Sequence, residues 1–272
     1  MHPFSSIFSL FPPPSSDAWK RDILTTLSKY IEIPNQSPLF DSECLTNGYQ
    51  DQAIELIMNW VKAQEVPGLT MKLVTEEGRT PVIFIEIEGN NGTNETVLMY
   101  GHMDKQPPME EGWDEGTGPR IPVIKGGKLY GRGGADDGYS VFASITAVKA
   151  LKAQGVPHAR IVVLIEACEE SGSRDLPHYI AKLKGEIGEP SLVVCLDSGC
   201  GNYEQLWLTA TLRGMLFGVL TVRVSAEGVH SGSGSGIIPS SFRIARQLLD
   251  RIEDKDTGKI LLKSLWADIP AE

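Results

Sequence analysis

The chain alternates between segments with helical and with strand-like spacing of apolar residues. Apolar residues three or four positions apart share one face of a helix, whereas short continuous apolar runs indicate buried strands. The predicted helices are Ser16–Ile31, Asp51–Gln64, Gly138–Gln154 and Asp175–Leu183. The predicted strands are Met71–Val74, Pro81–Ile87, Thr96–Tyr100, Ala159–Ile165 and Leu192–Leu196, and Lys105–Gly127 is predicted to be a long loop. This alternation predicts an α/β domain with a mostly parallel sheet flanked by helices.

The pattern changes near residue 212. Met215–Ser225 has the alternation of a long strand, and Ser240–Asp254 has the spacing of an amphipathic helix. One strand and one helix cannot bury both of their faces, so we expect the chain to end inside a smaller α+β domain. The predicted parts are an arm at 1–16, a domain at 17–212 and the incomplete beginning of a second domain at 213–272.

Composition restricts the classes of function. The formal net charge of −10 argues against nonspecific binding to nucleic acid or to an anionic membrane, since both require a positive field. No apolar run approaches the ~18 residues of a membrane-spanning helix. The first segment lacks a basic start and contains Pro12–Pro14, which argues against a secretory signal. The four cysteines have no Cys-x-x-Cys spacing, which favours a reduced cytoplasm.

Carboxylates follow the ends of four strand-like runs. These groups are His102 with Asp104, Asp136 with Asp137, Glu169 with Glu170, and Asp197. Ligands of open α/β sheets lie off the carboxyl ends of the strands, so we expect these side chains at one sheet edge. Mixed imidazole and carboxylate ligands suit Zn²⁺, Mn²⁺ or Co²⁺. The number of acids indicates two metals that share a bridging carboxylate.

Each motif alone also has a structural explanation. His102 can be a buried histidine hydrogen-bonded to its neighbour, and the glycine-rich run 131–138 can be a turn that caps a helix. Glu169 and Glu170 can begin a surface loop. The Gly-x-Gly spacing does not indicate a nucleotide site, because it lacks the Lys-Ser/Thr of a phosphate loop and the full dinucleotide fingerprint. Together the four motifs favour a metal site.

The order of these motifs resembles the dinuclear-zinc amidohydrolases and exopeptidases. That family includes carnosinase-type dipeptidases, glutamate carboxypeptidase, aminoacylase and succinyl-diaminopimelate desuccinylase. The motifs are His102-Met-Asp104, Gly131-Arg-Gly-x-x-Asp136-Asp137-Gly138, Glu169-Glu170-Ser-Gly-Ser and Asp197. The resemblance extends from about residue 17 to the end. It implies a zinc-exopeptidase-like catalytic domain, a lid or dimerisation domain, two divalent metal ions (zinc first, Mn or Co as alternatives) and a homodimer at full length.

The resemblance also implies roles for single residues. His102 and Asp197 would bind one metal, Glu170 the second, and Asp136 would bridge them. The remaining implied roles are a cis peptide between Asp136 and Asp137, Glu169 as general base, Asp104 as the group that orients His102, and His230 as a substrate contact that stabilises the oxyanion. In dimeric members that last histidine reaches the partner's site. Without the resemblance, His230 is a surface histidine in a glycine-rich loop.

The sequence departs from the family pattern at two points. Gly138-Tyr139 stands where dipeptidase relatives often carry Lys or Asn, and no candidate is present for the family's last histidine ligand. We therefore expect weak or no activity and an impaired second metal site. The predicted reaction is hydrolysis of a peptide or N-acyl amide bond in a small substrate with a free carboxylate. The alternatives are a non-catalytic metal-binding or dimerisation module and, disfavoured by the lack of a phosphate loop, a Mg²⁺-dependent phosphotransferase.

Overall fold

The computed structural model describes residues 19–268. The chain forms two compact units, Met1–Leu208 and Thr209–Glu272. The domain boundaries expected at residues 16 and 212 stay predictions. The predicted arm at 1–16 and the first residues of the first predicted helix lie outside the described residues.

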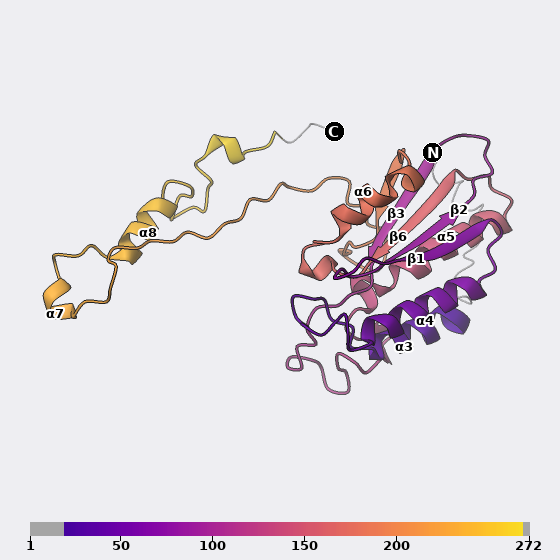
Figure 1. Ribbon diagram of the computed structural model, residues 1–272, viewed down its shortest axis with the longest axis horizontal. Coiled ribbons are helices and arrows are strands. Elements are labelled where there is room, and N and C mark those ends of the chain that lie inside the picture. The colour runs from indigo at the N-terminus through magenta and orange to yellow at the C-terminus, as the bar shows by residue number, and fades with distance from the viewer. Residues whose placement is uncertain (1–18, 269–272) are drawn as a thin grey trace. The chain divides into compact units, whose positions relative to one another are not determined.

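A five-stranded sheet forms the centre of the first unit, with the strand order β1-β2-β6-β3-β7 (Figure 1). The strands are β1 Leu69–Val74, β2 Val82–Ile87, β3 Thr96–His102, β6 Arg160–Glu166 and β7 Leu192–Cys195. β3 pairs in parallel with β6 and β7, whereas β2 is antiparallel to both of its neighbours. All strands except β2 therefore share one direction. The predicted α/β class is confirmed, with a mixed sheet.

Helices cover both faces of this sheet. The first predicted helix is a short π-helical turn η1, Trp19–Ile23, that continues as α3, Leu24–Glu32; the others are α4 Tyr49–Ala63, α5 Ser140–Ala153 and α6 Leu176–Ile187. Alternate residues of β6 enter two cores, because successive side chains of a strand point to opposite faces. Ile161 and Val163 pack with α3, α4 and α5, whereas Val162 and Leu164 pack with α6. This two-sided burial explains the continuous apolar run of β6.

The predicted loop Lys105–Gly127 contains one short strand. β4 (Val123–Lys125) pairs with β5 (Lys128–Tyr130) in a separate two-stranded sheet. Asp136 and Asp137 follow β5 and lie in the turn η2, Gly134–Gly138, directly before α5, and both have non-helical backbone angles. The prediction that all four acidic clusters follow strands of one sheet is therefore wrong for this pair, which reaches the sheet edge from a helix start.

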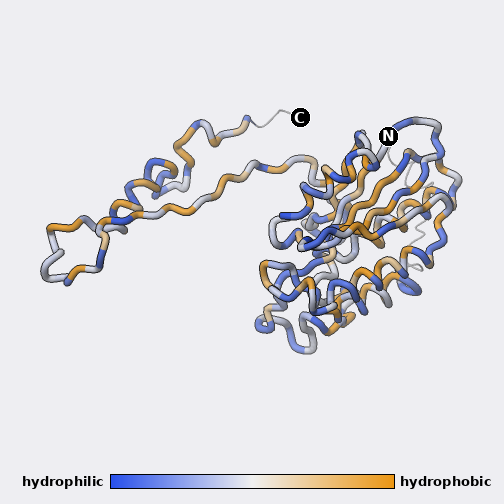
Figure 2. Tube along the Cα trace, in the orientation of Figure 1, coloured by the Kyte–Doolittle hydropathy of each residue, from blue (hydrophilic) through white to orange (hydrophobic). Residues whose placement is uncertain are grey.

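The second unit contains short helices and no paired strands in its described part. These helices are α7 Ser231–Gly234, α8 Ser241–Leu249 and η4 Lys263–Leu265. The predicted helix Ser240–Asp254 is present but shorter, and Ser240 Oγ caps it by accepting the Arg243 N–H. The predicted strand Met215–Ser225 is wrong, because in the described structure this segment does not pair with another strand, as a strand requires. Figure 2 shows its apolar residues, of which Val219 is 94% exposed.

None of the helices in the described range combines the length and the hydropathy needed to span a membrane.

Candidate metal centre

Three neighbouring strands bring their carboxyl ends to one edge of the sheet. His102 is the last residue of β3, which lies between β6 and β7. Glu169 and Glu170 begin the 3-10 turn η3, Glu169–Ser171, just after β6, and Asp197 follows β7. Because these strands are parallel, their ends meet, and the sequence-based expectation for these side chains holds.

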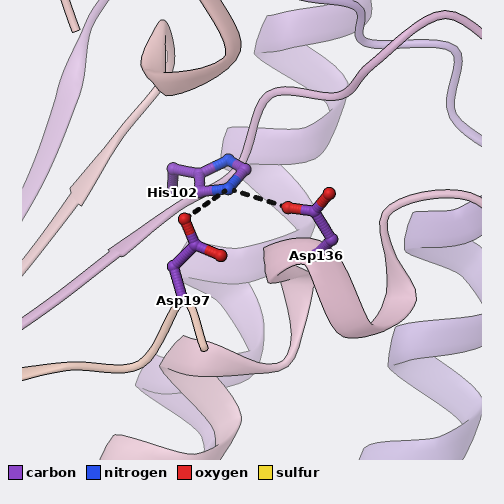
Figure 3. A group of neighbouring side chains, drawn as sticks. All are labelled: His102, Asp136 and Asp197. Atoms are coloured by element: carbon purple, nitrogen blue, oxygen red, sulfur yellow. Dashed lines mark hydrogen bonds and ion pairs between the residues drawn. The ribbon is translucent and has the colours of Figure 1, made fainter. Parts of the chain in front are cut away.

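His102 lies between two sets of acidic groups. Its ring is fully buried, and its Nε2 is 3.2 Å from Asp136 Oδ1 and 3.8 Å from Asp197 Oδ2 (Figure 3). Glu169 Oε2 is 3.9 Å from the same nitrogen. On the other side of the ring, Nδ1 is 3.1 Å from the Asp104 carbonyl oxygen and 3.4 Å from Asp104 Oδ1. Asp104 therefore favours a proton on Nδ1, which leaves Nε2 to face the carboxylates.

The donor atoms form two groups that share His102. One group contains His102, Asp136 and Asp197, and the other contains His102, Glu169 and Glu170; within each, the ligand atoms lie within 4.8 Å of one another. Ligand atoms about 2.0–2.2 Å from one Zn²⁺ are separated by roughly 3–3.6 Å. The first group, with two carboxylates within 3.8 Å of Nε2, comes close to that spacing.

Burial and close spacing shift the pKa values of these groups. Burial, together with the nearby Asp136 carboxylate, raises the pKa of Glu170 to about 7. Burial also raises the pKa of Glu169. For His102, burial lowers the pKa, but hydrogen bonds to Asp104 and Asp136 outweigh it and raise the pKa to about 11. Carboxylates this close repel one another unless protons or cations compensate.

Asp104 has more contacts than the sequence indicated. Besides facing His102 Nδ1, its carboxylate accepts the backbone N–H of Glu169 at 3.1 Å and that of Glu170 at 3.0 Å. These two bonds hold the start of η3 against the end of β3. A residue predicted to orient one histidine thus also contacts the backbone of both glutamates.

Asp137 supports the same strand end from the opposite side. Its Oδ2 accepts the His102 backbone N–H at 3.0 Å, and the Asp136–Asp137 peptide bond is cis, as the family resemblance implied. A Cβ on Gly101 would overlap the Ser140 hydroxyl and lie 2.6 Å from Asp137 Oδ2. The glycine before His102 therefore permits this close approach. Sequence reasoning gave Asp137 no such role.

Gln106 is a further residue of the site that sequence reasoning missed. Its Nε2 donates a hydrogen bond to Glu170 Oε2, while Glu170 Oε1 is buried without a hydrogen-bond partner in the described structure. A buried carboxylate oxygen with no protein donor is suited to a cation. With the His–carboxylate donor set, this orphaned oxygen indicates that the residues fit divalent metal.

His230 belongs to the second unit. It is the N-cap of α7, and its Nδ1 accepts the Gly232 N–H at 3.1 Å. The ring is exposed in that unit. Its predicted contact with substrate stays a prediction.

The fold and the donor set together define an α/β protein with a candidate divalent-metal site at the carboxyl edge of its sheet. The family model described as peptidase family M20/M25/M40 matches residues 98–238, more than half of the chain. The chain therefore belongs to the peptidase family M20/M25/M40.

Individual relatives agree with this assignment. The human protein named Beta-Ala-His dipeptidase is 32% identical over 70% of this chain and 37% of its own length. The Cys-Gly metallodipeptidase DUG1 of Saccharomyces cerevisiae is 28% identical over 97% of this chain and 55% of its own length. The solved structure of the S. cerevisiae di-peptidase Dug1p has a TM-score of 0.57 at 28% identity and covers 96% of this chain and 55% of its own. The chain thus spans about half the length of the relatives it matches, or less.

Proposed function

We propose that this chain carries the metal ligands and the general base of a metal-dependent dipeptidase. The observation that carries the proposal is the position of His102 Nε2, buried and within 4 Å of carboxylates from three different segments. The two relatives named for Beta-Ala-His and Cys-Gly dipeptides support small peptides as substrates. N-acyl amino acids are the second substrate class consistent with the motifs.

The proposed ligands divide between two ions, with zinc as the first candidate and Mn or Co as alternatives. His102 and Asp197 would hold one ion, Glu170 the other, and Asp136 would bridge them. A bound divalent ion supplies a Lewis acid that polarises a carbonyl and lowers the pKa of water. Asp104, which faces His102 Nδ1, would keep a proton on that nitrogen and leave Nε2 to hold the ion.

Glu169 is the proposed general base. Its side chain is one-third exposed and lies beside the ligands, with Oε2 3.9 Å from His102 Nε2. Burial raises its pKa above the ordinary glutamate value, which brings it closer to the neutral range where a base and acid work best. It would take a proton from water and return it to the leaving amine.

The second unit is proposed to complete the site at full length. His230 would contact the substrate and stabilise the oxyanion, in a homodimer whose partner contributes it. A cytoplasmic location, without nucleic-acid or membrane partners, is the proposed setting. The weak activity expected for the chain as given stays a prediction.

Two substitutions separate metal binding from catalysis. Glu169→Gln should bind Zn²⁺ with an affinity within about threefold of the unsubstituted chain by calorimetry, whereas His102→Ala should bind at least 100-fold more weakly. In an assay of Cys-Gly or β-Ala-His hydrolysis with Zn²⁺ or Mn²⁺, Glu169→Gln should lower the rate by about 100-fold or more. Zinc binding that survives His102→Ala would contradict the assignment. Unchanged hydrolysis in Glu169→Gln would favour another base.

The alternative function is a non-catalytic metal-binding or dimerisation module. It predicts zinc binding that depends on His102 but no hydrolysis that depends on Glu169. The same two variants therefore distinguish the enzyme from the module.

A further inference from the structure

A buried lysine directly follows Asp104. Lys105 is 2% exposed, and its ammonium has no ion-pair partner in the part of the chain that the structure describes. Its Nζ instead donates to the carbonyl oxygens of Tyr30 at 2.6 Å and Ile33 at 2.7 Å, with a longer contact of 3.4 Å to Ile31. A buried charge is costly unless it is hydrogen-bonded, so this arrangement requires an explanation.

The acceptors belong to the end of α3. The last carbonyls of a helix lack partners within the helix and carry the negative end of its dipole. Lys105 satisfies them from a segment more than seventy residues away in sequence. Its Nζ also lies 4.1 Å from the centre of the Tyr30 ring, in the position of a cation–π contact. The lysine thus joins the end of α3 to the segment that leaves β3.

Hydrogen bonds to the backbone on either side of Asp104 join the same two segments. Tyr30 Oη and Asn35 Nδ2 both donate to the Met103 carbonyl oxygen at 2.5 Å. The Lys105 N–H donates to the Asn35 carbonyl oxygen at 3.1 Å, and the Ser37 N–H donates to the Lys105 carbonyl oxygen at 3.0 Å. We call Tyr30, Asn35 and Lys105 the Lys105 clamp.

The glycine motif makes room for this clamp. Gly133 has a φ of +81°, and a Cβ at this position would lie 2.5 Å from Lys105 Cε. The second glycine of Gly131-Arg-Gly therefore serves the packing of the lysine stem, in addition to the turn. The side chain is enclosed by α3 on one side and by this turn on the other.

We propose that the Lys105 clamp is a positioning device that fixes the Asp104 carboxylate, and through it the pose of His102, Glu169 and Glu170. The backbone of Asp104 is held on both sides, because the Met103 carbonyl and the Lys105 N–H and carbonyl are all bonded to residues 30–37. Its carboxylate in turn accepts the Glu169 and Glu170 amides. Helix α3, which carries none of the candidate ligands, would thus determine the alignment of the site.

Amide hydrogen exchange of the metal-free chain tests this proposal directly. Lys105→Met keeps most of the side-chain volume but removes the donors. We expect the Glu169 and Glu170 amides to exchange at least tenfold faster in this variant, measured by NMR, while the Val163 and Leu164 amides of β6 keep their rates. The matched control is Lys149→Met, since Lys149 is an exposed lysine that donates to Gln64 Oε1 in the same unit. It should leave the two amides unchanged.

Two results would overturn the proposal. The first is unchanged exchange of the Glu169 and Glu170 amides in folded Lys105→Met. The second is equal acceleration at these amides and throughout β6, because it would indicate that Lys105 contributes to overall stability alone. If Lys105→Met does not fold, Tyr30→Phe decides, because it removes only the hydroxyl bond to Met103. This variant should accelerate the same two amides severalfold, and unchanged rates would refute the clamp. Because no metal is present, the outcome is independent of the proposed function.

Discussion

At His102, burial and hydrogen bonding act on the ring in opposite directions. Burial lowers its pKa, but the bonds to Asp104 and Asp136 prevail and raise it to about 11. The metal-free ring is therefore protonated at neutral pH, and a metal must displace that proton. We expect Zn²⁺ binding at pH 7 to release at least one proton. Calorimetry in buffers with different ionisation enthalpies measures this number, and a value of zero would exclude His102 as a ligand.

The acidic groups around His102 predict how stability depends on pH. Burial raises the folded-state pKa of Glu170 and of Asp137 to about 7. The unfolded-state pKa values of these two groups are ~4. Between that pH and pH 7 the folded chain binds more protons than the unfolded chain, so the free energy of unfolding falls as pH rises. His102 has the same effect from its unfolded pKa of ~6.5 up to about 11. Lys105 has the opposite effect above pH 7, because burial lowers its pKa to about 7 and the folded chain then binds fewer protons there than the unfolded chain.

We therefore expect the metal-free chain to lose stability from pH 5 to pH 7 and to change much less between pH 7 and pH 9, where Lys105 offsets His102. Urea unfolding in the presence of a chelator at pH 5, 7 and 9 provides the measurement. The substitution Glu170→Gln should flatten the part of the decline between pH 5 and 7. Stability that is constant or rises between pH 5 and pH 7 would show that the acids are not held as the structure has them.

At the scale of elements, two glycines provide a matched pair. Gly101 is near the end of β3, where an added Cβ would collide with Ser140 and Asp137. Gly185 lies within α6, and an added Cβ there would have no heavy atom within 4 Å. We expect Gly101→Ala to lower the free energy of unfolding by about 1–3 kcal/mol. Gly185→Ala should raise it by roughly 0.5–1 kcal/mol, because alanine favours helix. Chemical denaturation measures both, and a neutral Gly101→Ala would contradict the packing at the site.

The elements that sequence predicts well are those buried on both faces. The sequence predicts β6 because its five successive residues 161–165 are all needed in two cores. The parallel ends of β3, β6 and β7 then bring His102, Glu169 and Asp197 together. Met215–Ser225 was wrongly predicted as a strand. Alternating apolar and polar residues indicate a half-buried surface, but they do not identify the strand that must pair with the segment. That pairing depends on residues far away in the sequence.

Contacts between distant segments account for the rest of what sequence missed. The amide bonds from Glu169 and Glu170 to Asp104, and the bond from His102 to Asp137, join residues that no spacing rule relates. Gln106 had no signal at all, since it lies in a segment read only as a loop. Such bonds depend on where elements meet, whereas the ligands themselves could be found because metal chemistry restricts the residue types.

At the scale of the whole molecule, the two units differ in what they bury. Every buried residue in the described range lies in Met1–Leu208, and none lies after it. A chain that ends at Leu208 should therefore keep its midpoint of thermal unfolding within about 3 °C. This corresponds to a change of less than roughly 1 kcal/mol in the free energy of unfolding. A fall of more than about 10 °C would show that the second unit stabilises the first. Calorimetry of both chains provides the comparison.

The central claim is that His102 and carboxylates from separate segments hold divalent metal at the carboxyl edge of the sheet. A crystal of the chain equilibrated with Zn²⁺, with diffraction recorded on both sides of the zinc absorption edge, tests it most directly. We predict an anomalous peak about 2.0–2.2 Å from His102 Nε2 and from oxygens of Asp136 and Asp197. A weaker second peak should lie beside Glu170. No peak at His102, or zinc bound only at other residues, would contradict the account.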